Sequence, residues 1–148
     1  MRAKGAIWLL AVAAALAWTG GAGAQAATRG PMVTLPSGET VWDLTGDWDA
    51  VVEHFGPNMN LGTYPNVHRF TQTGNTFSAI RLKDNPPPSP RGAGNPVWRG
   101  ELDKNGFKRV ETISSHGSIS PIKGQISEDG NKIVLDDGWS LRVTLTRP

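Results

Sequence analysis

Cysteine is absent from this chain of 148 residues. Disulfides, thiol nucleophiles, iron–sulfur clusters and cysteine zinc sites are therefore excluded. Long apolar runs are also scarce. The longest one spans Ala6 to Trp18, and its 13 residues fall short of the roughly 20 that a membrane-spanning helix needs. No second run of this kind follows, so we expect no stable membrane insertion of the remaining chain.

The apolar run has the surroundings of a secretory leader. Arg2 and Lys4 precede it, and the small residues after it include Ala24-Gln25-Ala26, which fits the A-x-A cleavage pattern. We predict a signal peptide over 1–26, with cleavage after Ala24 as the alternative. The mature protein would then be periplasmic or secreted.

A basic surface is missing as well. Two of the 15 Lys and Arg residues lie in the predicted leader, and the other 13 balance the 13 Asp and Glu residues. No basic run occurs. Because attraction to phosphate dominates nucleic-acid binding, we expect no nucleic-acid partner.

Short alternating segments make up most of the mature chain. No window of 12 residues has a helical period, so the sequence predicts an all-β fold. An N-terminal arm at 27–42 precedes a barrel domain at 43–148. Eight strands are predicted in that domain, over 47–54, 67–72, 76–82, 97–102, 107–113, 121–127, 131–136 and 139–146. The inward face of 107–113 stays open, because its apolar residues share a parity with charged ones.

The lengths of the connections predict how these strands are arranged. The first, third and fifth are long, at 55–66, 83–96 and 114–120, whereas the second, fourth and sixth are tight turns with Gly and Asn. In a meander, odd connections share one end. We therefore predict an eight-stranded antiparallel up-and-down barrel, closed by tight turns at one end and open at the other. An open sandwich is the alternative.

The first predicted strand opens with Gly46-x-Trp48, which resembles the opening of lipocalins and of avidin-like barrels. Lipocalins also place a late arginine over this tryptophan. The resemblance implies that role for Arg147, with Arg142 as the alternative, and makes Gly46, Trp48 and Arg147 structural residues. The chain departs from lipocalins in being shorter and in lacking their disulfides and the helix after the barrel. No ligand-contact motif of the avidins matches, so biotin is not implied.

Strand direction gathers aromatic and histidine side chains at the open end. The first strand ends at His54 and the second begins near His68, and both side chains share the predicted inward face. Trp98 and Trp139 begin strands that leave the same end, and Tyr64 lies in the first loop. These five residues form the predicted ligand site. All five should line the mouth of the barrel.

Several inward positions farther down the barrel are small, namely Ala50, Ala79, Gly100 and Gly124. Small residues at one height can leave a cavity. Alternatively, they make room for large aromatic side chains that fill the interior, as in many small barrels. The sequence leaves both possibilities open.

Catalytic and metal chemistry have weak support. His116 lies near Ser114 and Ser115, but no nucleophile-elbow motif surrounds them, and no histidine spacing suits a metal. We predict no catalytic residue, no metal and no cofactor. The sequence leaves enzymatic activity open and favours a non-enzymatic role.

Two functions remain. The first is an exported lipocalin-like binding protein that holds a small, mostly apolar or aromatic ligand at the open end. The second is a protein-interaction module, such as an inhibitor or envelope assembly factor, acting through the rim loops 55–66 and 83–96.

Overall fold

The computed structural model describes residues 28–89 and 91–148, so the predicted signal peptide at 1–26 lies outside the described residues. These residues form an all-β molecule with one short 3-10 helix, η1 (Gly56–Leu61). The strands are β1 (Met32–Thr34), β2 (Thr40–Trp42), β3 (Gly46–His54), β4 (Thr63–Thr73), β5 (Thr76–Arg81), β6 (Pro96–Asp103), β7 (Gly106–Ile113), β8 (Ile119–Pro121), β9 (Lys123–Ile126), β10 (Lys132–Asp136) and β11 (Leu141–Thr146). Within these ranges no helix is long and apolar enough to cross a membrane.

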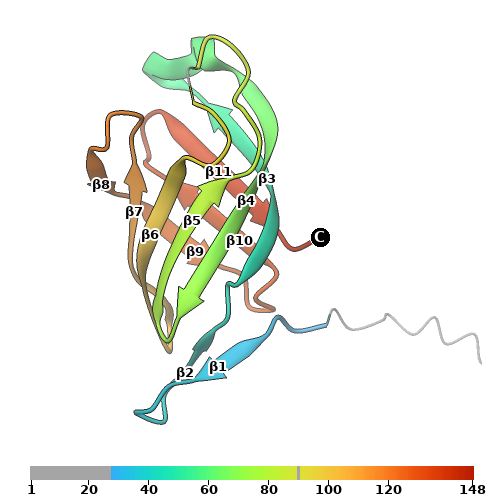
Figure 1. Cartoon of the computed structure of the whole chain (residues 1–148), viewed down its shortest axis with the longest axis vertical. Coiled ribbons are helices and arrows are strands. Elements are labelled where there is room, and N and C mark those ends of the chain that lie inside the picture. The colour runs from blue at the N-terminus through green and yellow to red at the C-terminus, as the bar shows by residue number, and fades with distance from the viewer. Residues whose placement is uncertain (1–27, 90) are drawn as a thin grey trace, which may run out of the picture.

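Nine of the strands form one antiparallel sheet that curls into a nearly closed barrel (Figure 1). Their order is β8-β7-β6-β5-β4-β3-β11-β10-β9. The two end strands are adjacent in the chain and meet at Ile122. At this residue the chain leaves β7 to pair with β10, and the Ile122 amide still donates to the Val110 carbonyl at 3.1 Å. The predicted up-and-down barrel is thus confirmed.

All eight predicted strands are present, but three differ in extent; the eighth begins at Leu141 rather than at residue 139. The sixth is divided into β8 and β9 at the corner residue Ile122, which is buried. The second begins at Thr63 rather than near residue 67, so Tyr64 lies in a strand and not in the first loop. In the sequence, Pro65 argues against a strand at this position, because proline has no N–H to donate to a neighbouring strand. It is tolerated because β5 ends opposite His68, which leaves this part of β4 paired on one side only.

A β-bulge decides the inward face of β7. Glu101 pairs with Arg109 and Leu102 pairs with Phe107, so Lys108 is an extra residue. The bulge reverses the alternation, because two residues of β7 oppose one of β6. Phe107 and Val110 therefore both contact the core despite their opposite parities. Simple alternation could not have decided this strand.

The half of the barrel near the tight turns is filled with aromatic side chains. Ring centroids of Trp48 and Phe70 lie 6.0 Å apart, those of Phe70 and Phe77 5.9 Å, and those of Phe77 and Phe107 5.5 Å. A Cβ at Gly100 would lie 2.7 Å from the Phe77 ring. One at Gly124 would lie 2.8 Å from Phe107. These two glycines therefore make room for aromatic rings.

Trp48 also organises the closed end. Its indole N–H donates to the Leu44 carbonyl at 2.8 Å, and the Arg147 guanidinium lies 4.3 Å from its ring centroid. Arg147 further donates to the main-chain carbonyls of Asp43 and Gly130. The contact that the lipocalin resemblance implies is present. Arg142, the alternative, forms an ion pair with Asp136 instead.

The N-terminal arm forms a hairpin of β1 and β2 at this same end (Figure 1). Val41 and Trp42 of the hairpin belong to the buried core, and the Trp42 ring lies where a Cβ of Gly130 would be. Gln72 holds the following segment by accepting from the Leu44 amide and donating to the Trp42 carbonyl. The arm therefore covers the closed end.

Candidate functional site

The open half of the barrel contains a cavity of about 290 Å³. It is enclosed by four of the five residues that the sequence predicts for a ligand site, namely His54, Tyr64, His68 and Trp98. Its apolar lining residues include Val52, Val97, Leu61, Leu141 and Val143. Its polar lining residues include Thr112, several serines, two asparagines, Asp137 and two arginines. A pocket of this volume lies near the lower end of the range for small-molecule sites.

Strand register brings several of these side chains next to one another. His54 at the end of β3 pairs with Leu141 at the start of β11. Val52, two residues earlier on the same face, pairs with Val143 on one side and Tyr64 on the other. Since alternate residues of a strand share a face, this group continues directly above the packed aromatic core.

His68 is the most deeply buried histidine, with 2% of its surface exposed. Its Nδ1 accepts a hydrogen bond from the Trp98 indole N–H at 3.0 Å, and this bond crosses β5 above the small side chain of Ala79. Burial, together with the smaller effect of the nearby Arg81 charge, lowers the pKa of His68 to about 3. The ring is therefore neutral at pH 7, with Nδ1 as an acceptor and the proton on Nε2.

His54 and Tyr64 form a second pair at the mouth. The His54 Nε2 and the Tyr64 hydroxyl oxygen are 3.3 Å apart, while the His54 Nδ1 is buried and has no partner among the described residues. Burial lowers the pKa of His54, and Arg91 lowers it further. Burial raises the pKa of Tyr64. Both side chains are thus neutral polar groups facing the cavity.

Arg81 is one of the cavity residues that the sequence-based prediction missed. It ends β5 and pairs with His68, and only 3% of its surface is exposed. Its position was detectable, because Arg81 shares a parity with Phe77 and Ala79, both buried core residues of the same strand. A charged residue on the apolar face of a strand is a signal for a site.

The long loop between β5 and β6 folds over the mouth and adds Asn85, Ser89 and Arg91 to the cavity wall. Buried Asn66 of β4 anchors this loop. Its side-chain amide donates to the Lys83 carbonyl at 3.2 Å and to the Asn85 side-chain oxygen at 3.1 Å. Arg91 is therefore carried by a loop that is fixed to the barrel, and no sequence periodicity could have placed it there.

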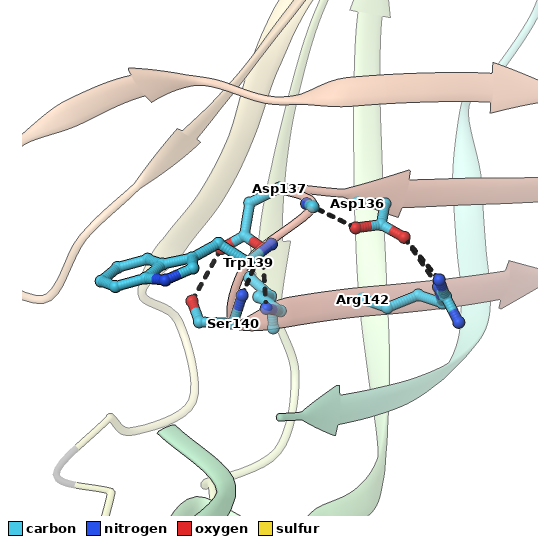
Figure 2. A network of polar contacts seen from close by, with 7 residues as sticks. Asp136, Asp137, Trp139, Ser140 and Arg142 are labelled. Carbon is cyan, nitrogen blue, oxygen red and sulfur yellow. Dashed lines mark hydrogen bonds and ion pairs between the residues drawn. The ribbon is translucent and has the colours of Figure 1, made fainter. Parts of the chain in front are cut away.

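Trp139 differs from the expectation. It lies at the open end, but its side chain is 69% exposed and is not part of the cavity wall. The strand β11 begins at Leu141, so Trp139 belongs to the preceding turn and does not follow the inward alternation. Figure 2 shows its ring extending away from the turn.

The Asp137 carboxylate holds that turn together. It accepts hydrogen bonds from the amides of Trp139, Ser140 and Leu141 at 2.7–2.9 Å, and from the Ser140 hydroxyl at 2.7 Å (Figure 2). These bonds lower the pKa of Asp137 against the opposing effect of its burial. The carboxylate is therefore charged at neutral pH and is already used within its own turn.

The structure does not bring the three histidines together. His116 is exposed in the loop after β7 and is not part of the cavity wall. The Ser114 hydroxyl accepts from the amides of His116 and Ser118, so it caps a turn. Within 28–89 and 91–148 no group of three or more His, Asp or Glu side chains is arranged to hold a metal ion.

Comparison with protein-family models, with curated proteins and with solved structures finds no match for this chain. The nearly closed antiparallel barrel is compatible with a calycin-type fold.

Proposed function

We propose that this protein is an exported, lipocalin-like binding protein that holds a small, mostly apolar or aromatic ligand in the open half of its barrel. The observation that carries the proposal is the cavity of about 290 Å³, which is lined by both apolar and hydrogen-bonding side chains. Sites of this kind combine apolar burial with a few polar groups that fix orientation. His54, Tyr64, His68 and Trp98 are the proposed contact residues.

The test uses the tryptophans of the two halves as reporters in nuclear magnetic resonance spectra of the full chain. Indole, 3-phenylpropanamide and 3-phenylpropanoate are added in turn. We expect a ligand to shift the indole N–H signal of Trp98, which lines the cavity, and to leave that of Trp48 unchanged, because Trp48 is fully buried in the closed half. The proposal is wrong if no probe shifts the Trp98 signal.

Native mass spectrometry adds a test that needs no chosen probe. A mass excess that is retained in gentle conditions and lost on denaturation would reveal a ligand bound in the cell. Recovery of the protein from the periplasm or the medium, shortened at the N-terminus, would support the proposed export.

A protein-interaction role is the second candidate, and one observation favours it. Met59 of η1 and Trp139 are 72% and 69% exposed at the open end. The segments that carry them adjoin, since the Phe55 amide donates to the Ser140 carbonyl at 3.0 Å. A partner that binds the loops 55–66 and 83–96 would cover these side chains. Trp139→Ser should then abolish binding of that partner, and its retention would contradict this role.

A further inference from the structure

Arg81 is a buried cation without a partner. Only 3% of its surface is exposed, and its Nε is fully buried with no hydrogen bond. No other nitrogen of its guanidinium bonds to any residue in 28–89 or 91–148. Arginine remains charged in proteins, and a buried charge that is neither paired nor hydrogen-bonded carries a large desolvation cost. A natural position that bears this cost calls for a functional explanation.

The carboxylates of the protein do not neutralise Arg81. The ion pairs of the described chain, such as Arg69 with Asp47 and Arg142 with Asp136, involve partly or largely exposed side chains on the outer face. Asp137 is the one carboxylate among the described residues of the cavity wall. Its oxygens already accept hydrogen bonds from three amides and one hydroxyl of its own turn.

A second arginine adds to the positive charge of the cavity. Arg91 lines the same wall, and its charge lowers the pKa values of both Arg81 and His54. Burial, together with the smaller effect of Arg91, lowers the pKa of Arg81 to about 10, which leaves it charged at neutral pH. The remaining titratable groups, His54, Tyr64 and His68, are neutral there. The cavity thus holds two cations and a carboxylate that is engaged elsewhere.

We propose that the ligand of this cavity is a small organic acid, whose carboxylate is bound by Arg81 together with Arg91 while its apolar or aromatic body packs against Trp98, Val52 and Val143. This inference rests on the proposed binding function and names its ligand class. The planar guanidinium matches a carboxylate through two parallel hydrogen bonds, and such charge-assisted bonds are the strong ones. An anion would supply the counter-charge that the protein itself does not provide.

The test compares an acid with its uncharged counterpart of nearly equal shape. Isothermal titration calorimetry at pH 7 measures binding of 3-phenylpropanoate and of 3-phenylpropanamide to the protein purified from the full chain. We expect the acid to bind about 10–100-fold more tightly, the ratio that a hydrogen-bonded charge pair supports. A third probe, 2-phenylethylphosphonate, distinguishes a carboxylate from a phosphoryl group.

Three variants test whether Arg81 causes the preference for the acid over the amide. Arg81→Met should remove the preference for the acid, and urea denaturation of the variant shows that it is folded. Arg81→Lys should keep part of the preference, because a point charge lacks the planar fork. The matched control is Arg142→Met, which removes one positive charge at the same end but on the outer face of β11, and it should behave like the unchanged protein.

The outcomes separate the two proposals. Equal binding of acid and amide, with the Trp98 signal shifted, would overturn this inference and leave the binding function standing. An acid preference that survives Arg81→Met would do the same. If 2-phenylethylphosphonate binds more tightly than 3-phenylpropanoate, the carboxylate part of this inference is wrong and the ligand carries a phosphoryl group instead. Failure of every probe to bind would overturn both proposals.

Discussion

Two arginines point inward at opposite ends of this barrel, and their surroundings differ completely. Arg147, at the closed end, lies 4.3 Å from the Trp48 ring centroid and donates to two main-chain carbonyls. Arg81, at the open end, has no partner for its guanidinium among the described residues and is more deeply buried. The first arginine completes a structural unit. The second lacks an interaction partner within the described part of the protein.

The same difference extends to the two halves of the interior. In the closed half, the rings of Trp48, Phe70, Phe77 and Phe107 contact one another, and glycines give them room. In the open half, polar side chains surround a cavity of about 290 Å³. Close packing contributes most of the stability of a fold, whereas a cavity with unmet polar groups lowers it. We therefore expect substitutions in the two halves to act with different size and even opposite sign.

The largest effect is expected at Trp48. Trp48→Ala removes a fully buried ring, the platform of Arg147 and the donor to the Leu44 carbonyl. We expect it to lower the free energy of unfolding by about 3–5 kcal/mol, as for other large-to-small core changes. Urea denaturation measures this loss. A loss below about 1 kcal/mol would contradict the structural role of the closed end.

The two arginines themselves give the next test, because the same substitution should act in opposite directions. Arg147→Met loses two hydrogen bonds and a cation–π contact, and we expect it to destabilise the empty protein by about 1–3 kcal/mol. Arg81→Met removes an unpaired buried charge from an apolar strand face, and we expect it to raise the free energy of unfolding by about 1–3 kcal/mol. Urea denaturation of both variants without ligand decides the comparison. Destabilisation by Arg81→Met would mean that this arginine supports the fold.

The sequence predicted the closed half better than the open half for physical reasons. Strict alternation from Trp48 to His54 predicts that both of these side chains, near the two ends of β3, face the interior. The tight Gly-containing turns predict which end of the barrel is closed. Alternation also contains the signal for Arg81, which follows Phe77 and Ala79 on one face. It contains no signal for Arg91, because a loop has no period, and it misplaces Trp139, because the Asp137 turn ends the alternation at Leu141.

His68 should make the open half sensitive to acid. Its pKa is about 3 in the folded protein, against an ordinary value of 6.5. Between these two pH values the unfolded chain binds a proton at this ring and the folded protein does not, so stability falls as the pH falls from about 6.5 toward 3. The contribution is at most about 1.4 kcal/mol per pH unit.

His68→Gln tests this effect, since glutamine stays neutral throughout the range. We expect the free energy of unfolding of the variant, measured by urea denaturation at several pH values, to decrease less steeply below pH 6.5. The acidic groups and His54 are common to both proteins, so the difference between the two slopes reports His68. Equal slopes would show that the folded protein accommodates a charged His68.

The smallest effect is expected at Trp139. Its substitution tests whether the ligand contacts the rim of the cavity as well as its wall. Trp139 and Trp98 both lie at the open end, but Trp139 is 69% exposed whereas Trp98 is 3% exposed and bonded to His68. Trp139→Ser should change the free energy of unfolding by less than about 0.5 kcal/mol, as surface substitutions do, and leave 3-phenylpropanoate binding unchanged. Trp98→Phe keeps an aromatic ring but removes the donor to His68, and it should weaken that binding. If Trp139→Ser weakens binding as much as Trp98→Phe does, the ligand extends beyond the cavity onto the rim, and the site includes all five residues that the sequence predicts.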